Sequence, residues 1–405
     1  MRPIPTSADV VVIGGGPAGS TTANLLAERG YDVVLLEQAR HPRPTVGESV
    51  LPHMWKYADT LGVTKDIEDA GFLLKSGGLT IWNGEIRQAL LSDFGFDRPG
   101  MHVERDRFDK ILLDGAARRG ARVYEEVRVT RAHLEDETNR GVSWEDKSSG
   151  ERGRTRCKVI VDGSGQAAVI ANQSRFRAFD PDLRFVCIWG YFSDSAYVSH
   201  GGFIRPFDER WQRDRRPMTF ASSVGNWGWC WHLVQRDHTS VGLVLAPEDA
   251  LAFKARPGGL EERFLAALRE IPGISLLLES ARLVPDSIRA IRDFAYRPTQ
   301  LCGDGWYLVG DASSFVDPIN GAGVLVAFYT GSFAAWAVAS TLERPDKEHY
   351  YRELFDAQVR QRVSLYRISA LPEGVNSYAD EDYPLALKAA LLERPSEQEI
   401  LLVQT

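Results

Sequence analysis

The sequence predicts a mixed α/β fold in which a domain with a parallel sheet carries an inserted domain of antiparallel β-sheet and is followed by a short helical region. Three observations support this prediction. A strand, glycine loop, helix and strand follow one another near the N-terminus, similar strand and glycine patterns return near residues 160 and 310, and strand-like stretches are dense between them. At 405 residues the chain is long enough for two or three domains.

The composition is that of an ordinary globular protein, with 44% hydrophobic and 25% charged residues. The formal net charge of -7 argues against nucleic acid as a partner. Four cysteines lie far apart without CxxC spacing, so neither a metal site nor a disulfide framework is expected. The apolar stretch 322–342 is rich in small residues and suits a packed helix better than a membrane span, and the N-terminus leaves no space for a signal peptide. A cytoplasmic protein is expected.

The first pattern is the segment ADVVVIGGGPAGSTTANLLAERGYDVVLLEQAR, residues 8–40. It holds an apolar strand, a turn with Gly14, Gly16 and Gly19, a helix of small residues, a second strand and an acid at Glu37. Such glycines allow a tight turn, close approach of backbone amides to a pyrophosphate, and close packing of helix on strand. The helix N-terminus stabilises phosphates, and Glu37 can accept both ribose hydroxyls of an adenosine. An acid there disfavours a 2′-phosphate, so FAD or NAD is predicted.

Three later segments favour FAD over NAD. HVERDRFDKILLDGAARRGARV places Arg105 before an amphipathic helix, and KVIVDGSGQAAVI offers another strand with a glycine turn after Asp162. GDGWYLVGDASSFVDPINGAGVLVAFYTGSFAAWAVAST gives a strand, a GD pair ending at Asp311, a proline turn and a long helix starting near Gly323. Over residues 8–345 these patterns resemble the flavoprotein group that includes aromatic hydroxylases, geranylgeranyl reductases and flavin-dependent halogenases.

This resemblance implies a Rossmann-like FAD-binding domain of three-layer ββα architecture. It also implies that Asp311 binds the ribityl chain of FAD, and that the following turn and helix N-terminus face the flavin pyrimidine ring and stabilise an anionic reduced flavin. The residues expected to bind FAD are Gly14, Gly16, Pro17, Ala18, Gly19, Glu37, Gly47, Glu48, Ser49, Arg105, Asp162, Gly310, Asp311, Pro318, Gly321, Ala322, Gly323 and Val324.

Within that group, further segments resemble the flavin-dependent halogenases, particularly those acting on phenols or pyrroles. TVGESVLPHMWKYADTLGV, residues 45–63, resembles their GES-L-P segment beside the flavin. AGFLLKSGGLTIWNG, residues 70–84, resembles the stretch that carries their active-site lysine, which would be Lys75. GWCWHL, residues 228–233, resembles their GWxWxIP motif, although the end of that motif is not kept here.

The resemblance implies a reaction for these residues. Reduced FAD reacts with oxygen to give a C4a-hydroperoxide, and attack by a halide ion yields hypohalous acid. Trp229 and Trp231 would form an aromatic wall that keeps the substrate from the flavin and suppresses monooxygenation. Lys75 would hold hypohalous acid or form a haloamine, and its pKa should be lowered by desolvation. No second nucleotide loop for NAD(P)H is evident, so a separate flavin reductase is expected to supply reduced FAD.

Blander interpretations of the same residues stay open. In a strand, Trp227, Trp229 and Trp231 point to one side and could simply form a buried face. Lys75 could be an exposed loop lysine, as lysines usually are. The turn 321–323 lacks the serine or threonine of many halogenases and also occurs in hydroxylases and reductases, although its backbone amides could still hold halide. His53 and His232 are expected to be structural or surface residues.

The domain boundaries follow from the motifs. A discontinuous FAD-binding domain is expected from 1–180 and 285–345, a β-sheet substrate domain from 181–284, and a helical C-terminal region from 346–405. Residues 236–238 should form a hairpin turn, and 134–156 a solvated hairpin. The C-terminal region is shorter than the helices that many halogenases carry over their substrate chamber, so a more open chamber, or one completed by a partner, is expected.

Together these features predict an FADH2- and O2-dependent halogenase-type enzyme, a two-component oxidoreductase. Its substrate is expected to be a small electron-rich aromatic, a phenol or pyrrole, either free or bound to a carrier protein in a natural-product pathway. An FAD-dependent monooxygenase or oxidase on the same scaffold is the main alternative. A flavin-binding protein without catalytic activity is the third hypothesis.

Overall fold

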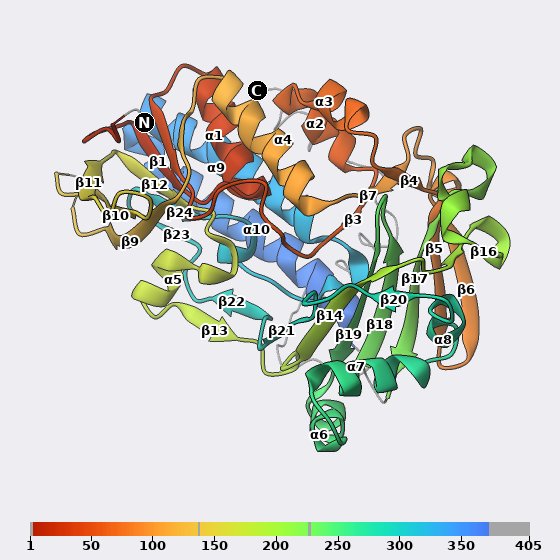
Figure 1. Ribbon diagram of the computed structural model, residues 1–405. Helices are drawn as coiled ribbons and strands as arrows, with labels where there is room; N and C mark the ends of the chain where they lie inside the picture. Colours follow the sequence, from red (N-terminus) through yellow and green to blue (C-terminus); the bar gives the residue numbers. More distant parts are fainter. Residues whose placement is uncertain (1–2, 137, 226–227, 372–405) are drawn as a thin grey trace.

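The computed structural model describes residues 3–136, 138–225 and 228–371 (Figure 1). These residues form two large sheets. One sheet lies with its helices at the upper left of Figure 1, and the other, whose central strands are green, lies at the lower right. The element order alternates strands and helices near the N-terminus and is dominated by strands from residue 186 to 245.

The first sheet has the strand order β23-β24-β12-β1-β2-β8, and all its pairs are parallel except β23 with β24. Its strands are β1 (Val10–Ile13), β2 (Val33–Leu36), β8 (Arg122–Tyr124), β12 (Val159–Asp162), β23 (Cys302–Gly303) and β24 (Trp306–Leu308). Strands from three separate parts of the chain therefore complete this one sheet.

The two faces of β1 pack against different layers because side chains alternate along a strand. Val10 and Val12 share a core with the helices α1 (Pro17–Glu28) and α9 (Gly323–Glu343). Val11 and Ile13 share a core with a three-stranded antiparallel sheet on the opposite face. That sheet consists of β9 (Val127–His133), β10 (Gly141–Asp146) and β11 (Arg152–Arg156). The result is the predicted three-layer ββα arrangement, although the 134–156 hairpin is less solvated than expected, because Trp144 packs into the core.

The helical layer also contains α4 (Arg105–Arg118) and α10 (Glu348–Ala370). α9 is long and apolar enough to cross a membrane, but most of it is buried, and it packs between α1 and α10. This matches the expectation of a packed core helix. α10 forms the first part of the expected helical C-terminal region 346–405, and residues 372–405 lie outside the described part of the chain.

The second sheet has the order β20-β14-β19-β18-β17-β5-β6, with β21 also pairing with β14. Its strands are β5 (Gly77–Trp82), β6 (Glu85–Leu90), β14 (Val186–Ser193), β17 (Met218–Val224), β18 (Gly228–Val234), β19 (Thr239–Leu245), β20 (Arg282–Leu283) and β21 (Arg289–Arg292). The helices α6 (Pro247–Ala255), α7 (Leu260–Arg269) and α8 (Ile274–Leu277) share a core with one face. The expected turn at 236–238 is confirmed, since the Gln235 amide donates to the His238 carbonyl at 2.8 Å.

Two features of the second sheet differ from the expected boundaries. β5 and β6 come from the segment 1–180 that was assigned to the FAD-binding domain, and β5 pairs in parallel with β17. β21 lies beyond residue 284 and still belongs to this sheet. Pairing between distant segments is set by the tertiary fold, so a linear division of the chain could not locate it.

A small third sheet connects the two halves of the molecule. It has the order β3-β7-β4 and consists of β3 (Ser49–Val50), β7 (Gly100–His102) and β4 (Leu73–Lys75). The helices α2 (Met54–Leu61) and α3 (Thr64–Asp69) lie between β3 and β4 in the chain. Ser49 pairs with His102, and Lys75 pairs with Gly100, so this sheet brings three separate segments together. The remaining short elements are α5 (Val169–Gln173), β13 (Arg177–Phe179), β15 (Tyr197–Val198), β16 (Ile204–Arg205) and β22 (Tyr296–Pro298).

Candidate active site

A cavity of about 950 Å³ extends from the carboxyl ends of the parallel strands to the second sheet. Its wall includes the loops after β1, β2 and β12 and residues of β4, β5, β17 and β18. Ligands of open α/β sheets bind outside the carboxyl ends of the strands, and this volume lies near the upper end of the usual range for ligand pockets. The cavity therefore joins the nucleotide-binding loops to the region of Lys75 and the tryptophans.

Most of the predicted site residues line this cavity. They are Gly14, Gly16, Pro17, Ala18, Glu37, Gly47, Glu48, Ser49, Lys75, Arg105, Trp229, Trp231, Gly310, Asp311, Pro318, Gly321, Gly323 and Val324. Gly19, Asp162 and Ala322 are not part of its wall.

The glycine loop has the close approaches that its pattern predicts. A Cβ on Gly19 would lie 2.0 Å from the carbonyl oxygen of Gly14, which itself has a φ of +96°. The amide of Gly15 donates to Glu37 Oε2 at 2.6 Å, so the acid at the end of β2 holds the loop after β1. α1 begins without a side-chain cap at the cavity, and such a free helix N-terminus fits the pyrophosphate of a dinucleotide.

Asp162 has a different role from the one expected. Its buried carboxylate accepts hydrogen bonds from the amides of Ser164, at 3.0 Å, and Ile170, at 2.7 Å. The side chain holds the glycine turn after β12 to the first turn of α5, because one carboxylate oxygen accepts from each. Gln166 in this turn reaches the cavity instead and donates to Asp311 Oδ2 at 3.4 Å.

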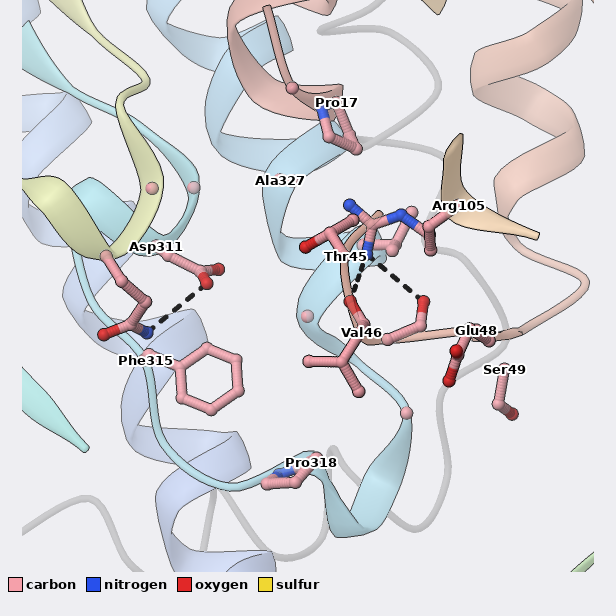
Figure 2. A pocket seen from close by; sticks show the side chains of 18 of the residues that line it. Pro17, Thr45, Val46, Glu48, Ser49, Arg105, Asp311, Phe315, Pro318 and Ala327 are labelled. Carbon is pink, nitrogen blue, oxygen red and sulfur yellow. Dashed lines mark hydrogen bonds between the residues drawn. The ribbon is translucent and has the colours of Figure 1, made fainter. Parts of the chain in front are cut away.

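Arg105, at the start of α4, anchors the GES segment beside the cavity (Figure 2). Its guanidinium donates to the carbonyl oxygens of Val46, at 2.8 Å, and Gly47, at 3.3 Å. Asp109 one turn later pairs with the same guanidinium at 2.8 Å. Desolvation raises the pKa of Asp311, on the other side of the cavity, to about 6, and the positive charge of Arg105 opposes this rise.

The proline turn before α9 is tied to the tryptophan wall by Asp317, which the sequence analysis did not single out. Oδ1 of Asp317 accepts from the amide of Ile319 at 2.8 Å and from the indole Nε1 of Trp229 at 3.1 Å. Oδ2 is buried and has no hydrogen-bond partner among the described residues. Burial raises the pKa of Asp317 to about 7, so its protonation changes near neutral pH.

Replacing Asp317 by asparagine should therefore make the free energy of unfolding less dependent on pH between about pH 4 and pH 7. In the wild type the unfolded carboxyl ionises near pH 4 while the folded one stays protonated up to about pH 7, so stability falls across this window. The expected loss is at most about 1.4 kcal/mol per pH unit. Asparagine keeps an acceptor for both donors, so Asp317→Asn should gain stability relative to the wild type from pH 5 to pH 7. Urea unfolding at both values checks this, and parallel pH profiles would contradict it.

The tryptophan wall lies on the face of β18 that points to the nucleotide-binding half. Trp229 and Trp231 are 5% and 4% exposed, and their ring centroids are 5.6 Å apart. They share a core with Phe294 and partly buried Phe315, whereas Cys230 packs on the opposite face with the helices. The alternation predicted for this strand is confirmed at these positions, and Trp227 lies outside the described residues. Both residues are buried on one face of the strand and also line the cavity, so the two interpretations of the tryptophans hold together.

Lys75 is buried at the end of β4, so its interpretation as an exposed loop lysine is wrong. Only 3% of the residue is exposed, and its Nζ donates to Ser49 Oγ at 2.6 Å. Burial lowers the pKa of Lys75 to about 8, which agrees with the expected lowering by desolvation. Among the described residues no carboxylate pairs with this amine.

Two predicted residues of the GES segment make contacts that sequence alone did not indicate. Ser49 was expected to bind FAD, and its hydroxyl bonds to Lys75. Buried Glu48 accepts from the Tyr191 hydroxyl at 2.9 Å, which ties this segment to β14 of the second sheet. A Cβ on Gly321 would lie 3.4 Å from Ser49 Oγ, so the turn before α9 approaches the same point. The turn before α9 and Lys75 are thus neighbours through Ser49.

The comparison with protein families agrees with this fold and cavity, since a family model described as an FAD binding domain matches residues 7–187. An FAD-binding domain is thus identified over residues 7–187. The residues present fit this cofactor, because the N-termini of α1 and α9 both reach the cavity without side-chain caps.

Known relatives place the chain more closely. It is 35% identical over 346 residues to tryptophan 2-halogenase of Chondromyces crocatus, covering 84% of this chain and 62% of that protein. It is 31% identical over 357 residues to the flavin-dependent halogenase armH3 of Armillaria mellea, covering 84% and 68%. The structure of the myxobacterial chondrochloren halogenase CndH superposes with a TM-score of 0.79 at 26% identity, over 99% of this chain and 96% of that one. The chain belongs to the flavin-dependent halogenase family, and it spans less than two thirds of the tryptophan 2-halogenase.

Proposed function

We propose that this protein uses reduced FAD, oxygen and a halide ion to halogenate an electron-rich aromatic compound of the phenol or pyrrole class. The observation that carries the proposal is the position of Lys75. Its buried amine lines the same cavity as the glycine loop and the turn before α9. A membership in the flavin-dependent halogenase family agrees with this arrangement.

FAD would lie along the glycine loop, Glu37, Arg105 and Asp311, and when reduced it supplies the electrons with which oxygen and halide form hypohalous acid. The chain's own part is to guide that oxidant. Trp229 and Trp231 would exclude the aromatic substrate from the flavin side, because two buried indoles occupy that part of the cavity wall. Lys75 would receive the oxidant, and its pKa of about 8 keeps part of the amine neutral near neutral pH.

The partners of the reaction follow from the same proposal. A separate flavin reductase would supply reduced FAD. FAD would occupy the glycine loop after β1, and no second loop of this kind for NAD(P)H is evident in the sequence. The substrate would be a small aromatic, either free or tethered to a carrier protein in a natural-product pathway. The second candidate function is monooxygenation, which the turn 321–323 favours, because no side-chain hydroxyl stands there to hold a halide ion.

The test is a reaction of the purified protein with FAD, a flavin reductase, NADH and oxygen on a panel of phenols and pyrroles, with and without bromide. Mass spectrometry should show a bromine isotope doublet only in the bromide arm. A mass gain of one oxygen in both arms would identify a monooxygenase instead. Slow flavin reoxidation that no aromatic accelerates, with no product in either arm, would identify a flavin-binding protein without catalysis.

A further inference from the structure

Behind Lys75 lies a chain of hydrogen-bonding side chains that ends at His102. Thr219, on β17, stands between them: its Oγ1 is 3.5 Å from Lys75 Nζ, 3.4 Å from Ser49 Oγ and 2.9 Å from His102 Nε2. The other ring nitrogen of His102, Nδ1, is 2.9 Å from the carbonyl oxygen of Val234. Three segments, β3–β4, β7 and the second sheet, therefore meet at one polar cluster in an apolar part of the fold.

His102 has its tautomer set by this surrounding. A carbonyl oxygen can only accept, so Nδ1 carries the hydrogen in the bond to Val234. The residue is fully buried, and burial together with the nearby charge of Lys75 lowers the pKa of His102 to about 3. The ring is then neutral, and Nε2 is left as an acceptor for the Thr219 hydroxyl.

This tautomer gives the whole chain one direction. The Thr219 hydroxyl donates its hydrogen to His102 Nε2, so its oxygen can only accept from Ser49 and Lys75. Ser49 is then the donor in its contact with Thr219, and its own lone pairs face the amine of Lys75 at 2.6 Å. Both hydroxyls next to Nζ therefore act as acceptors toward the amine. The amine is held in place by the hydrogen bonds that it donates to Ser49 and Thr219.

We propose that His102 is a positioning residue for Lys75, acting through Thr219 and Ser49 to hold the amine in one orientation toward the cavity. This inference rests on the proposed halogenation, because it assigns the orientation of the group that would receive the oxidant. The packing of the lysine stem supports it. A Cβ on Gly100 would lie 2.7 Å from Lys75 Cε, so the stem lies against bare backbone, and the hydrogen bonds of its amine set where the tip points.

The titratable groups that face this chain are few. They are Lys75 on β4, His102 on β7 and His232 on β18, and a charge on His232 lowers the pKa of His102. His232 is buried and bonded to Ser195 at 2.8 Å, and burial lowers its pKa to about 3, so it stays neutral over the range of the test. A change in the titration of Lys75 near pH 8 therefore reports on the hydroxyls beside it.

The test compares Thr219→Val with the wild type and with Thr219→Ser, all loaded with FAD. Valine has nearly the shape of threonine without the hydroxyl, and serine restores the hydroxyl. Competitive acetylation followed by mass spectrometry of the Lys75 peptide gives the pKa of this amine without any need for activity. Loss of an acceptor for the ammonium should lower this pKa by about one unit in Thr219→Val, and Thr219→Ser should return it to the wild-type value.

A kinetic readout completes the test on any substrate that gives product. Thr219→Val should lower kcat about tenfold with KM for the aromatic unchanged, because orientation and not substrate binding is lost. In His102→Gln, which keeps an acceptor for Thr219, kcat should fall less than in His102→Leu. An unchanged Lys75 titration with an unchanged kcat in Thr219→Val would overturn the inference. A shifted titration in a protein that forms no halogenated product would support the chain of contacts and overturn the proposed function.

Discussion

Lys75→Met should lose at least about 100-fold of the halogenated product while still oxidising reduced FAD. A positioned group in contact with the reacting atoms contributes on the order of 100-fold or more to a rate. Methionine fills a similar volume in this buried position and lacks the amine, so the cavity wall should survive the change. The product is measured by mass spectrometry and the flavin by its absorbance in the same reaction.

The matched control is Lys65→Met. Lys65 lies on α3, its side chain is 85% exposed, and it pairs with Asp69 one turn away. This variant should keep wild-type product formation, since an exposed ion pair contributes little. Product at the wild-type level in Lys75→Met would remove Lys75 from the proposed reaction, and loss of flavin oxidation together with product would place its role at the cofactor instead.

Gly19→Val should destabilise the nucleotide-binding half and abolish FAD retention. The first side-chain carbon would lie 2.0 Å from the Gly14 carbonyl oxygen and 3.3 Å from Cγ1 of Val12, and the first of these neighbours is backbone of the glycine loop itself. Forcing an atom into such a site costs about 3 kcal/mol, and the displaced loop would no longer present its amides to a pyrophosphate. Thermal unfolding and FAD retained through gel filtration measure the two effects.

Gly259→Ala is the control for this substitution. Gly259 precedes α7, has a negative φ, and would meet no atom within 4 Å of an added Cβ. The variant should lose no more than about 1 kcal/mol of stability, because alanine is a poorer N-cap than glycine. Normal FAD retention in Gly19→Val would show that the loop tolerates the extra carbons and that the close packing of α1 on β1 is not what the cofactor site depends on.

The N-terminal half could be predicted from sequence because its signals are local. Glycine spacing, the apolar strand around Val12 and the acid at Glu37 lie within one short segment, and each has one physical reason to be there. The alternation of Trp229 and Trp231 is local in the same sense. By contrast, β5 carries nothing that shows its pairing with β17, since the partner lies more than a hundred residues away.

The interior of the site was only partly predictable. The roles of Asp317, Thr219 and His102 depend on neighbours from other segments of the chain, which a local pattern does not indicate. The one signal in the sequence was a polar residue within an apolar stretch, which is too common to identify a partner. Asp162 is the opposite case, because it occupies a motif position but lies outside the cavity wall, and its carboxylate accepts from the amides of Ser164 and Ile170.

The path of the chain between the two large sheets has a consequence for engineering this protein. The chain enters the second sheet at β5, returns through β7 to the first, and crosses again before β14 and after β21. A single cut therefore leaves each product without strands that its sheet requires. The β5–β6 hairpin needs two junctions of its own in a chimera, and residues 181–284 expressed alone would form a sheet with an unpaired edge at β17, the strand that carries Thr219.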